Sequence, residues 1–185
     1  TAGITAAVRA GVDSIEHGTM LDEETARLMA ERGTWLVPTL ETFQRGVEIG
    51  LSSGQEPVML EKGKAILRHQ QPAFERAMRH HVKIAYGLDD EPKYSTREFQ
   101  ALITAGLTPL QALQCATINA ASLLGVDAGA LENGKLADVI ALDGDPLKDA
   151  KSYDRVVFVM KGGAVMSGEP PAASSAAGTR TPPGE

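Results

Sequence analysis

"VDSIEHG", residues 12–18, is the first β-like run of the chain and the start of the pattern that predicts its fold. The run ends in a histidine followed by a glycine. The residues after it, LDEETARLMAERG at 21–33, predict a helix that Asp22 can cap and Gly33 can end. WLVPTL at 35–40 is a continuous apolar run, which is typical of a parallel strand buried on both faces. A strand, a helix and a strand in this order predict an α/β fold.

Further elements of the same kind follow toward the C-terminus. VKIAYGLDD at 82–90 predicts a third strand, at whose end Asp89 lies. Helices are predicted at 3–11, at about 56–80, at 95–106 and at 108–125, and whether Pro72 breaks the second of these is left open. The last of these begins with a capping box formed by Thr108 and Gln111. Its apolar residues predict one buried stripe of Leu110, Leu113, Ala120 and Leu124.

The pattern changes after Gly125. GKLADVIALDGDP at 134–146 and YDRVVFVMKGGAV at 153–165 are β segments joined by turn-rich linkers, and they predict a small β module. The residues from 169 to 185 are rich in Pro, Ala, Ser and Gly and contain no large apolar side chain. They predict a disordered tail.

Composition narrows the range of functions. The chain has 185 residues, of which 43% are hydrophobic and 23% charged, and this balance is typical of a globular protein with a sizeable core. The net charge is −6 and the basic residues are scattered, which argues against nucleic acid and membrane partners. No apolar run approaches the roughly 20 residues that span a bilayer. The single cysteine, Cys115, excludes a disulfide framework and favours a cytoplasmic location, while an N-terminal signal upstream of Thr1 is left open.

His17 and Asp89 each lie at the end of a predicted strand. Catalytic residues of a (β/α)8 barrel lie at the C-terminal ends of its strands, so these two side chains are candidates for one site. An open doubly wound sheet would also bind ligands there, but the sequence contains no GxGxxG or Walker motif. An imidazole and a carboxylate suit a zinc-like metal. Zinc enzymes usually supply about three protein ligands, so these two leave the set incomplete.

Several segments in this order carry a resemblance to a known family. They are residues 10–40 around VDSIEHG, VKIAYGLDD, TPLQALQCATINAASLLG at 108–125, and GKLADVIALDGDPL with VVFVMKGG at 134–147 and 156–163. Over about residues 1–168 the chain resembles the C-terminal half of metal-dependent amidohydrolases of the imidazolonepropionase-like and Xaa-Pro dipeptidase-like group. The resemblance implies that residues 1–125 form the C-terminal part of a (β/α)8 TIM barrel, strands six to eight. Residues 126–168 would then form part of a small β-sandwich, and 169–185 the tail.

The resemblance also implies a ligand set and a chemistry. Members of this family hold one or two divalent metals with an HxH pair on the first strand, a carboxylated lysine on the fourth, histidines on the fifth and sixth, and an aspartate on the eighth. His17 matches the sixth-strand histidine and Asp89 the eighth-strand aspartate, so the other ligands would precede Thr1. The metal, expected to be Zn²⁺, would activate water, and Asp89 would act as general acid and base.

The sequence departs from the family where Leu88 and Asp90 replace a Thr or Ser before the aspartate and a small residue after it. Because of this departure, the sequence leaves open whether one or two metal ions are bound. Two further residues are candidates for substrate binding: Thr39 at the end of the second strand, where a core or capping role is an equal alternative, and Tyr94, which could also be a solvent-facing loop residue.

Other polar residues receive structural interpretations. Glu16 is expected to point away from His17 and to form a structural hydrogen bond. His80 and His81 lie before the third strand, on the side away from the predicted site, and His81 is expected at a turn position that favours Gly or Asn. Cys115 is expected to be a buried helix residue, and Asn119 is expected to tie its helix to a neighbouring loop. Trp35 and Pro38 are expected to pack around the second strand.

The favoured function is hydrolysis of a C–N bond in a peptide-like, dipeptide-like or cyclic amide by a longer protein that contains this chain. An alternative is a catalytically inactive fragment or a structural half that complements another segment. A one-metal lyase or isomerase is weaker, because GKLADVIALDGDP resembles the return of an amidohydrolase chain to its β-sandwich. Whether the full-length protein is a homo-oligomer is left open.

Overall fold

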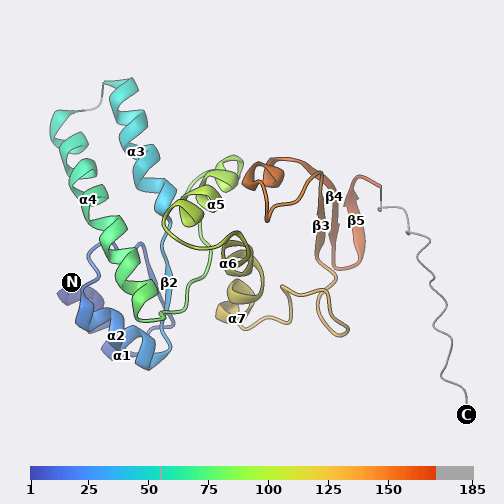
Figure 1. The fold of residues 1–185 in the computed structure, drawn as a ribbon, viewed down its shortest axis with the longest axis horizontal. Coiled ribbons are helices and arrows are strands. Elements are labelled where there is room, and N and C mark those ends of the chain that lie inside the picture. The colour runs from blue at the N-terminus through green and yellow to red at the C-terminus, as the bar shows by residue number, and fades with distance from the viewer. Residues whose placement is uncertain (55, 170–185) are drawn as a thin grey trace, which may run out of the picture.

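The computed structural model of the chain describes residues 1–54 and 56–169 (Figure 1). Helices and parallel strands alternate in the first part, and a small antiparallel sheet follows at the other end of the molecule. The α-helices are α1 (Ala2–Ala10), α2 (Glu23–Arg32), α3 (Leu40–Ser53), α4 (Pro57–Arg79), α5 (Ser95–Thr104), α6 (Pro109–Gln114) and α7 (Ala120–Leu124). The strands are β1 (Ser14–Glu16), β2 (Trp35–Val37), β3 (Val139–Leu142), β4 (Val156–Lys161) and β5 (Ala164–Ser167). Short 3₁₀ turns occupy η1 (Pro92–Tyr94) and η3 (Ala150–Asp154), and a π-helical turn occupies η2 (Cys115–Asn119). Most of the predicted tail, residues 170–185, lies outside the described residues.

The parallel strands confirm a mixed α/β architecture. β1 pairs with β2 in parallel register, from Ser14 opposite Trp35 to Glu16 opposite Val37. The predicted third strand is reduced to a parallel bridge between Leu36 and Ile84. These pairings bring the C-terminal ends of the three parallel segments, at residues 16, 37 and 86, to the same edge of the sheet.

Local capping signals placed several helix ends correctly. Asp22 accepts a hydrogen bond from the Thr25 amide at 2.8 Å, and Gly33 ends α2 with a left-handed φ of 72°. The predicted capping box of Thr108 and Gln111 is present at the start of α6. In each case the side chain or the glycine satisfies backbone groups that the helix itself leaves unpaired.

The long helices differ from the sequence analysis in two places. No element was predicted between residues 40 and 56, but α3 forms there and packs along α4 (Figure 1). The break that Pro72 could introduce is absent, because α4 runs through Pro72 to Arg79. Buried Ala73, Phe74 and Ala77 follow this proline, so tertiary packing outweighs the loss of one backbone donor.

The predicted apolar stripe of residues 108–125 was also wrong. Leu110 is 51% and Leu124 72% exposed, while the buried positions are Ala112, Cys115 and Ala121. The π-helical turn η2 inserts between α6 and α7 and shifts the phase of the second helix relative to the first. Within this turn Asn119 donates a hydrogen bond to the Ile84 carbonyl at 2.9 Å. Asn119 therefore connects its helix to the third parallel segment, and not to a loop as predicted.

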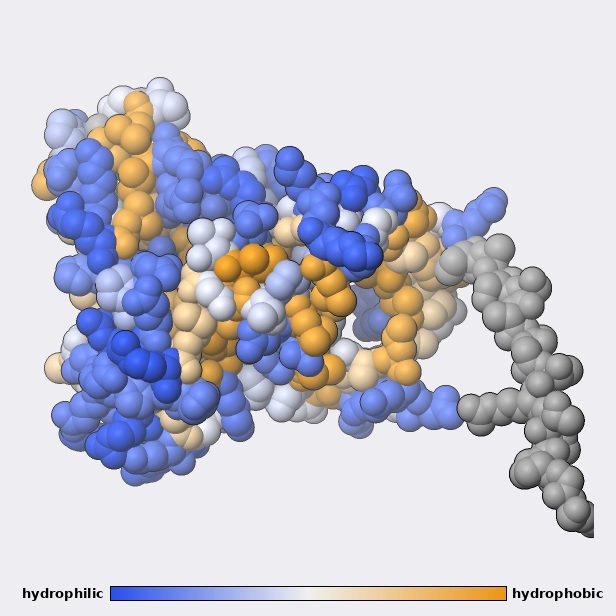
Figure 2. Space-filling view, in the orientation of Figure 1, coloured by the Kyte–Doolittle hydropathy of each residue, from blue (hydrophilic) through white to orange (hydrophobic). Residues whose placement is uncertain are grey.

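The small sheet has the strand order β3-β4-β5 and is antiparallel. It is attached to the helical part by stacking of Tyr153 on Phe99, with ring centroids 3.7 Å apart. Phe158 is buried, but most other apolar side chains of this region face solvent, as Figure 2 shows. The exposed members are Leu131, Leu136, Ile140, Leu147, Val156, Val157, Val165 and Met166.

We expect the isolated chain to associate in solution, because exposed apolar surface and open strand edges pair with other chains. Size-exclusion chromatography with light scattering measures this association. The double change Val165→Thr with Met166→Thr should shift the distribution toward monomer, since threonine retains strand propensity and removes apolar surface. Lys161→Thr on β4 is the matched control and should leave association unchanged. A monodisperse monomer of the unmodified chain would contradict the prediction.

Candidate metal and active site

His17 lies directly after β1, at the edge where the parallel segments end. Its backbone N–H donates to the Val37 carbonyl at 2.8 Å, and its own φ is 65°. Gly18 continues the turn with a φ of 60°, and a Cβ on it would lie 2.5 Å from the Leu36 side chain. A side chain at position 18 would be strained and would displace the buried Leu36 side chain, so this turn favours glycine.

The His17 ring is oriented by Thr39, which is 2% exposed. His17 Nδ1 lies 2.6 Å from Thr39 Oγ1, and that hydroxyl donates its single proton to the Pro38 carbonyl at 2.9 Å. This assignment of the hydroxyl proton makes Nδ1 the donor to Thr39 and leaves the lone pair of Nε2 free. A second hydrogen bond of this kind is what fixes the tautomer of a metal-binding histidine. The predicted substrate-binding role of Thr39 stays a prediction.

The structure brings the two predicted ligands together. His17 Nε2 lies 3.7 Å from Asp89 Oδ2, and the two side chains are 37% and 62% exposed. Two ligands of one zinc ion, each about 2.0–2.2 Å from it, can span this separation. The pair therefore fits a shared divalent metal. No group of three or more His, Cys, Asp and Glu that could hold a metal occurs among residues 1–54 and 56–169.

Backbone strain marks the same place. Of the non-glycine residues with positive φ in the described ranges, three belong to the site, and they are His17, Thr39 and Asp89 with φ of 65°, 45° and 52°. Such a conformation costs on the order of 1–3 kcal/mol per residue and persists only where the surroundings enforce it. Strain of this kind clusters at functional sites.

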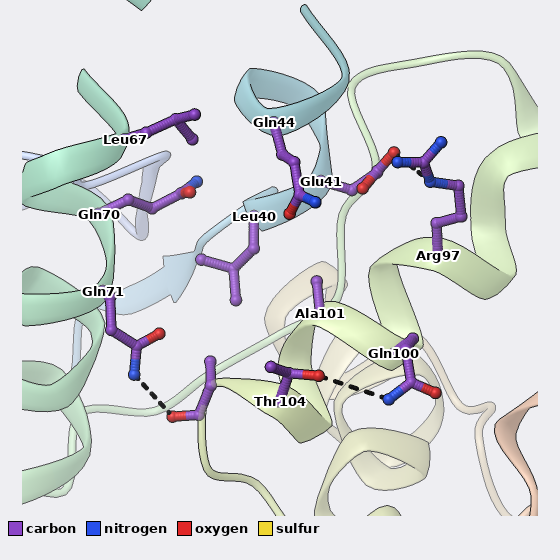
Figure 3. A pocket seen from close by; sticks show the side chains of 11 residues that line it. Leu40, Glu41, Gln44, Leu67, Gln70, Gln71, Arg97, Gln100, Ala101 and Thr104 are labelled. Atoms are coloured by element: carbon purple, nitrogen blue, oxygen red, sulfur yellow. Dashed lines mark hydrogen bonds and ion pairs between the residues drawn. The ribbon is translucent and has the colours of Figure 1, made fainter. Parts of the chain in front are cut away.

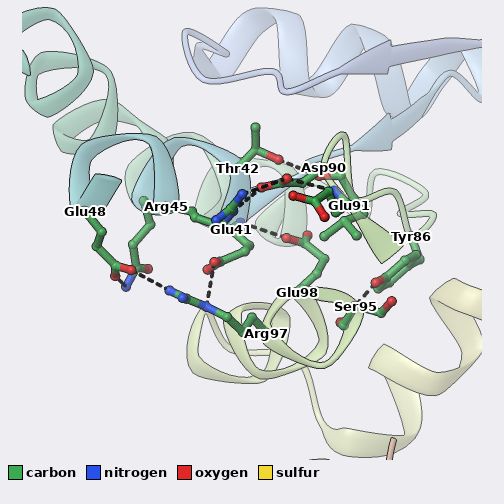
Figure 4. Close-up of polar contacts among 12 residues, drawn as sticks. Glu41, Thr42, Arg45, Glu48, Tyr86, Asp90, Glu91, Ser95, Arg97 and Glu98 are labelled. Atoms are coloured by element: carbon green, nitrogen blue, oxygen red, sulfur yellow. Dashed lines mark hydrogen bonds and ion pairs between the residues drawn. The ribbon is translucent and has the colours of Figure 1, made fainter. Parts of the chain in front are cut away.

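Helix α3 holds the residues on both sides of Asp89 (Figure 4). Thr42 Oγ1 donates to the Leu88 carbonyl at 2.5 Å. Arg45 forms a two-pronged pair with Asp90, at 2.5 Å from Nε and 3.2 Å from Nη2. The Asp90 carboxylate points to Arg45, whose hydrogen bonds lower the pKa of Asp90 and whose positive charge balances the carboxylate.

Tyr94 covers the same ion pair, because the Arg45 guanidinium carbon lies 3.6 Å from its ring centroid. Tyr94 is thus packed against Arg45, which holds Asp90, the residue directly after Asp89. Its predicted contact with substrate stays a prediction.

A buried carboxylate that the sequence did not reveal fixes the start of α3. Glu98 is 0% exposed, and its two oxygens accept from the amides of Leu40 at 3.0 Å and Glu41 at 2.8 Å (Figure 4). Burial raises the pKa of Glu98 to about 7, against the lowering effect of these two amides. The spacing of Ser95 and Glu98 resembles a local capping box, which conceals this long-range partner in the sequence.

Two hollows flank α3. One of about 490 Å³ lies between α3, α4 and α5 and is lined by both polar and apolar side chains, with Gln70 Nε2 pointing into it without a hydrogen-bond partner in the described part of the chain (Figure 3). Neither His17 nor Asp89 lines it. The other, of about 280 Å³, is an apolar groove between α3 and α4 that begins at Phe43. The Phe43 ring meets the His17 ring edge-on at 5.3 Å, so this groove adjoins the candidate site.

The remaining candidates occupy structural positions. His80 Nε2 lies 2.6 Å from Glu23 Oε1 on the surface, and His81 has the left-handed φ of 57° that its turn position predicted. Glu16 is exposed and accepts from the Ser14 hydroxyl at 2.7 Å. Cys115 is buried, as predicted, and burial raises its pKa to about 11. A thiol with this pKa is a poor nucleophile at neutral pH.

The chain is similar to several known proteins. Ochratoxinase from Aspergillus niger is 39% identical over 178 residues, which cover 90% of this chain and 36% of ochratoxinase. Imidazolonepropionase from Acinetobacter baumannii is 38% identical over 101 residues, which cover 50% of this chain and 25% of that protein. The crystal structure of a Xaa-Pro dipeptidase with methionine bound in its active site superposes with a TM-score of 0.84 at 35% identity, and covers 90% of this chain and 43% of the dipeptidase chain.

The chain thus spans less than half the length of each of these proteins. A model of the amidohydrolase family matches residues 1–166, which is nearly all of the described part. By this match, and by its likeness to these relatives, the chain belongs to the amidohydrolase family.

Proposed function

We propose that this chain is part of a metal-dependent hydrolase that cleaves C–N bonds of amides, and that His17 and Asp89 are two of its site residues. The observation that carries the proposal is the 3.7 Å approach of His17 Nε2 to Asp89 Oδ2, with the other ring nitrogen committed to Thr39. Membership of the amidohydrolase family supports the reaction class.

The two side chains would have different roles. A divalent metal, which we propose to be zinc, supplies a polarised carbonyl and water of lowered pKa when it is bound. His17 would hold it through the free lone pair of Nε2. Asp89 would take a proton from water on its carboxylate and deliver it to the leaving amine. Its open position suits this exchange, since its side chain is 62% exposed.

We propose a dipeptide-like amide as the substrate. The support is the dipeptidase among the similar structures, which carries methionine in its active site. The groove that begins at Phe43 offers apolar surface next to His17, with Val47, Met59, Leu60 and Ile66 along it. An apolar substituent of the substrate would fit there. Thr39 and Tyr94 stay candidates for further substrate contacts.

We further propose that residues 1–125 supply strands six to eight of a (β/α)8 barrel and that 126–168 supply part of a β-sandwich. The support is the parallel order of the segments ending near residues 16, 37 and 86, together with the chain's span of less than half of its relatives. The remaining metal ligands would then come from another part of the full-length protein.

Among residues 1–54 and 56–169, no helix has both the length and the apolar character to cross a membrane.

A second candidate function is structural. The chain would form half of a barrel with another segment and would have no activity of its own. The observation that favours it is that residues 1–54 and 56–169 contain no group of three or more candidate ligands. Metal content after dialysis separates the two. The isolated chain should retain little zinc and the full-length protein should retain it, whereas a full-length protein without metal would favour the second function.

In the full-length protein we expect His17→Ala to lower zinc content and amide hydrolysis together, because it removes a ligand. Asp89→Asn should reduce kcat by about a hundred- to ten-thousand-fold, the usual contribution of a general acid or base, while most of the zinc remains. Elemental analysis and steady-state kinetics measure both quantities. His80→Ala is the control and should change neither. Unchanged kcat in Asp89→Asn would refute the mechanism.

Thr39→Val should weaken zinc binding by about ten- to a hundredfold, because it removes the acceptor that fixes the His17 ring while keeping the side-chain shape. Competition with a chelator measures the affinity. Thr39→Ser retains the hydroxyl and should bind zinc nearly as tightly as the unmodified protein. Equal affinities in the valine and serine variants would show that Thr39 does not orient His17.

A further inference from the structure

The start of α3 depends on a residue from a distant part of the sequence. Glu98 on α5 accepts the amides of Leu40 and Glu41, which lie 58 and 57 residues earlier in the chain. These first N–H groups of a helix have no partner within it, and its N-terminus favours negative charge. Both oxygens of a fully buried carboxylate are used in this contact, so the position of the first turn of α3 is tied to Glu98.

The residue before this turn is the one that contacts His17. Thr39 has a left-handed φ of 45° and is followed directly by the two amides that Glu98 holds. Its hydroxyl lies 2.6 Å from His17 Nδ1. A left-handed threonine is kept in place only by its surroundings, and the fixed amides after it are part of them.

The same helix also reaches the Asp89 segment. Thr42 and Arg45, one turn apart near the start of α3, contact Leu88 and Asp90 on either side of Asp89. A displacement of the first turn of α3 would therefore move supports of both site residues. The Glu98 carboxylate is a buried group that holds this turn through two hydrogen bonds.

We propose that Glu98 is a positioning residue of the candidate metal site, which acts on His17 through the first turn of α3 and Thr39. This inference rests on the proposed function in taking His17 as a metal ligand. A cap that serves folding alone would affect the stability of the protein and leave the His17 ring unchanged, so the state of that ring is the quantity to measure.

The test uses the full-length protein with ¹⁵N-labelled histidine, freed of metal by a chelator, and a His17→Asn variant to assign the His17 signals. We expect the Nδ1–H tautomer in the unmodified protein. Glu98→Gln keeps the side-chain volume but replaces one acceptor oxygen by an NH₂ group, so it can accept only one of the two amides. We expect both His17 tautomers in this variant and a zinc affinity lower by about tenfold or more.

Two further variants make the test specific. Glu98→Asp keeps both oxygens but withdraws them by one methylene, and we expect a smaller change in the same direction. Glu41→Gln is the matched control, because Glu41 is also a buried carboxylate, paired with Arg97 at 2.6 Å, but its side chain contacts neither amide. It should leave the His17 tautomer and the zinc affinity unchanged.

The outcomes decide the inference separately from the proposed function. Should Glu98→Gln not fold, Glu98→Asp replaces it in the comparison. A variant that folds with a lower Tm but keeps the tautomer and the zinc affinity of the unmodified protein overturns the positioning role. If the unmodified protein hydrolyses no amide and the His17 tautomer still changes in the Glu98 variants, the proposed function fails and the positioning role stands.

Discussion

The carboxylate of Glu98 lies out of contact with water and accepts hydrogen bonds from the first two N–H groups of α3. Removing a carboxylate from water costs several kcal/mol. Hydrogen bonds that involve a charged group return about 1.5–3 kcal/mol each. The raised pKa of Glu98, about 7, indicates that burial outweighs these bonds. The contact joins α5 to the start of α3 and so fixes the relative position of these two helices.

Around this contact the charges on α3 divide between two sides. On one side Arg97 pairs with Glu41 at 2.6 Å and with Glu48 at 2.8 Å. Arg97 and Glu48 are partly exposed, so solvent screens their pair. On the other side Arg45 and Asp90 are mostly buried, paired through two contacts and covered by Tyr94.

The Arg45–Asp90 pair explains how the chain accommodates an acidic residue directly after Asp89. The charge of Asp90 is directed to α3, and the carboxylate of Asp89 is left facing His17. The departure from the family pattern at position 90 thus supplies an ion pair that supports the candidate site. Leu88, the other departure, contributes its backbone carbonyl to Thr42, a contact that places no demand on its side chain.

The sequence by itself determined the features that depend on local chemistry. Asp22, Gly33, Thr108 and Gln111 placed helix ends, because caps satisfy backbone groups within a few residues. His17 and Asp89 could be named as candidates because each follows a predicted strand in a motif of a known family. The α/β class followed from the order of apolar segments.

Only the tertiary structure decided the features whose partners are distant in the chain. α3 contains Gly46 and Gly50, which weaken a helix, and it forms because α4 and Glu98 hold it. The continuity of α4 through Pro72 and the phase shift at η2 likewise follow from packing. Glu98 and Arg45 meet their partners 45 to 58 residues away, so no local pattern could identify them as supports of the site. Local rules act over one or two turns of a helix, and the pairing of distant buried charges is fixed only when the chain is folded.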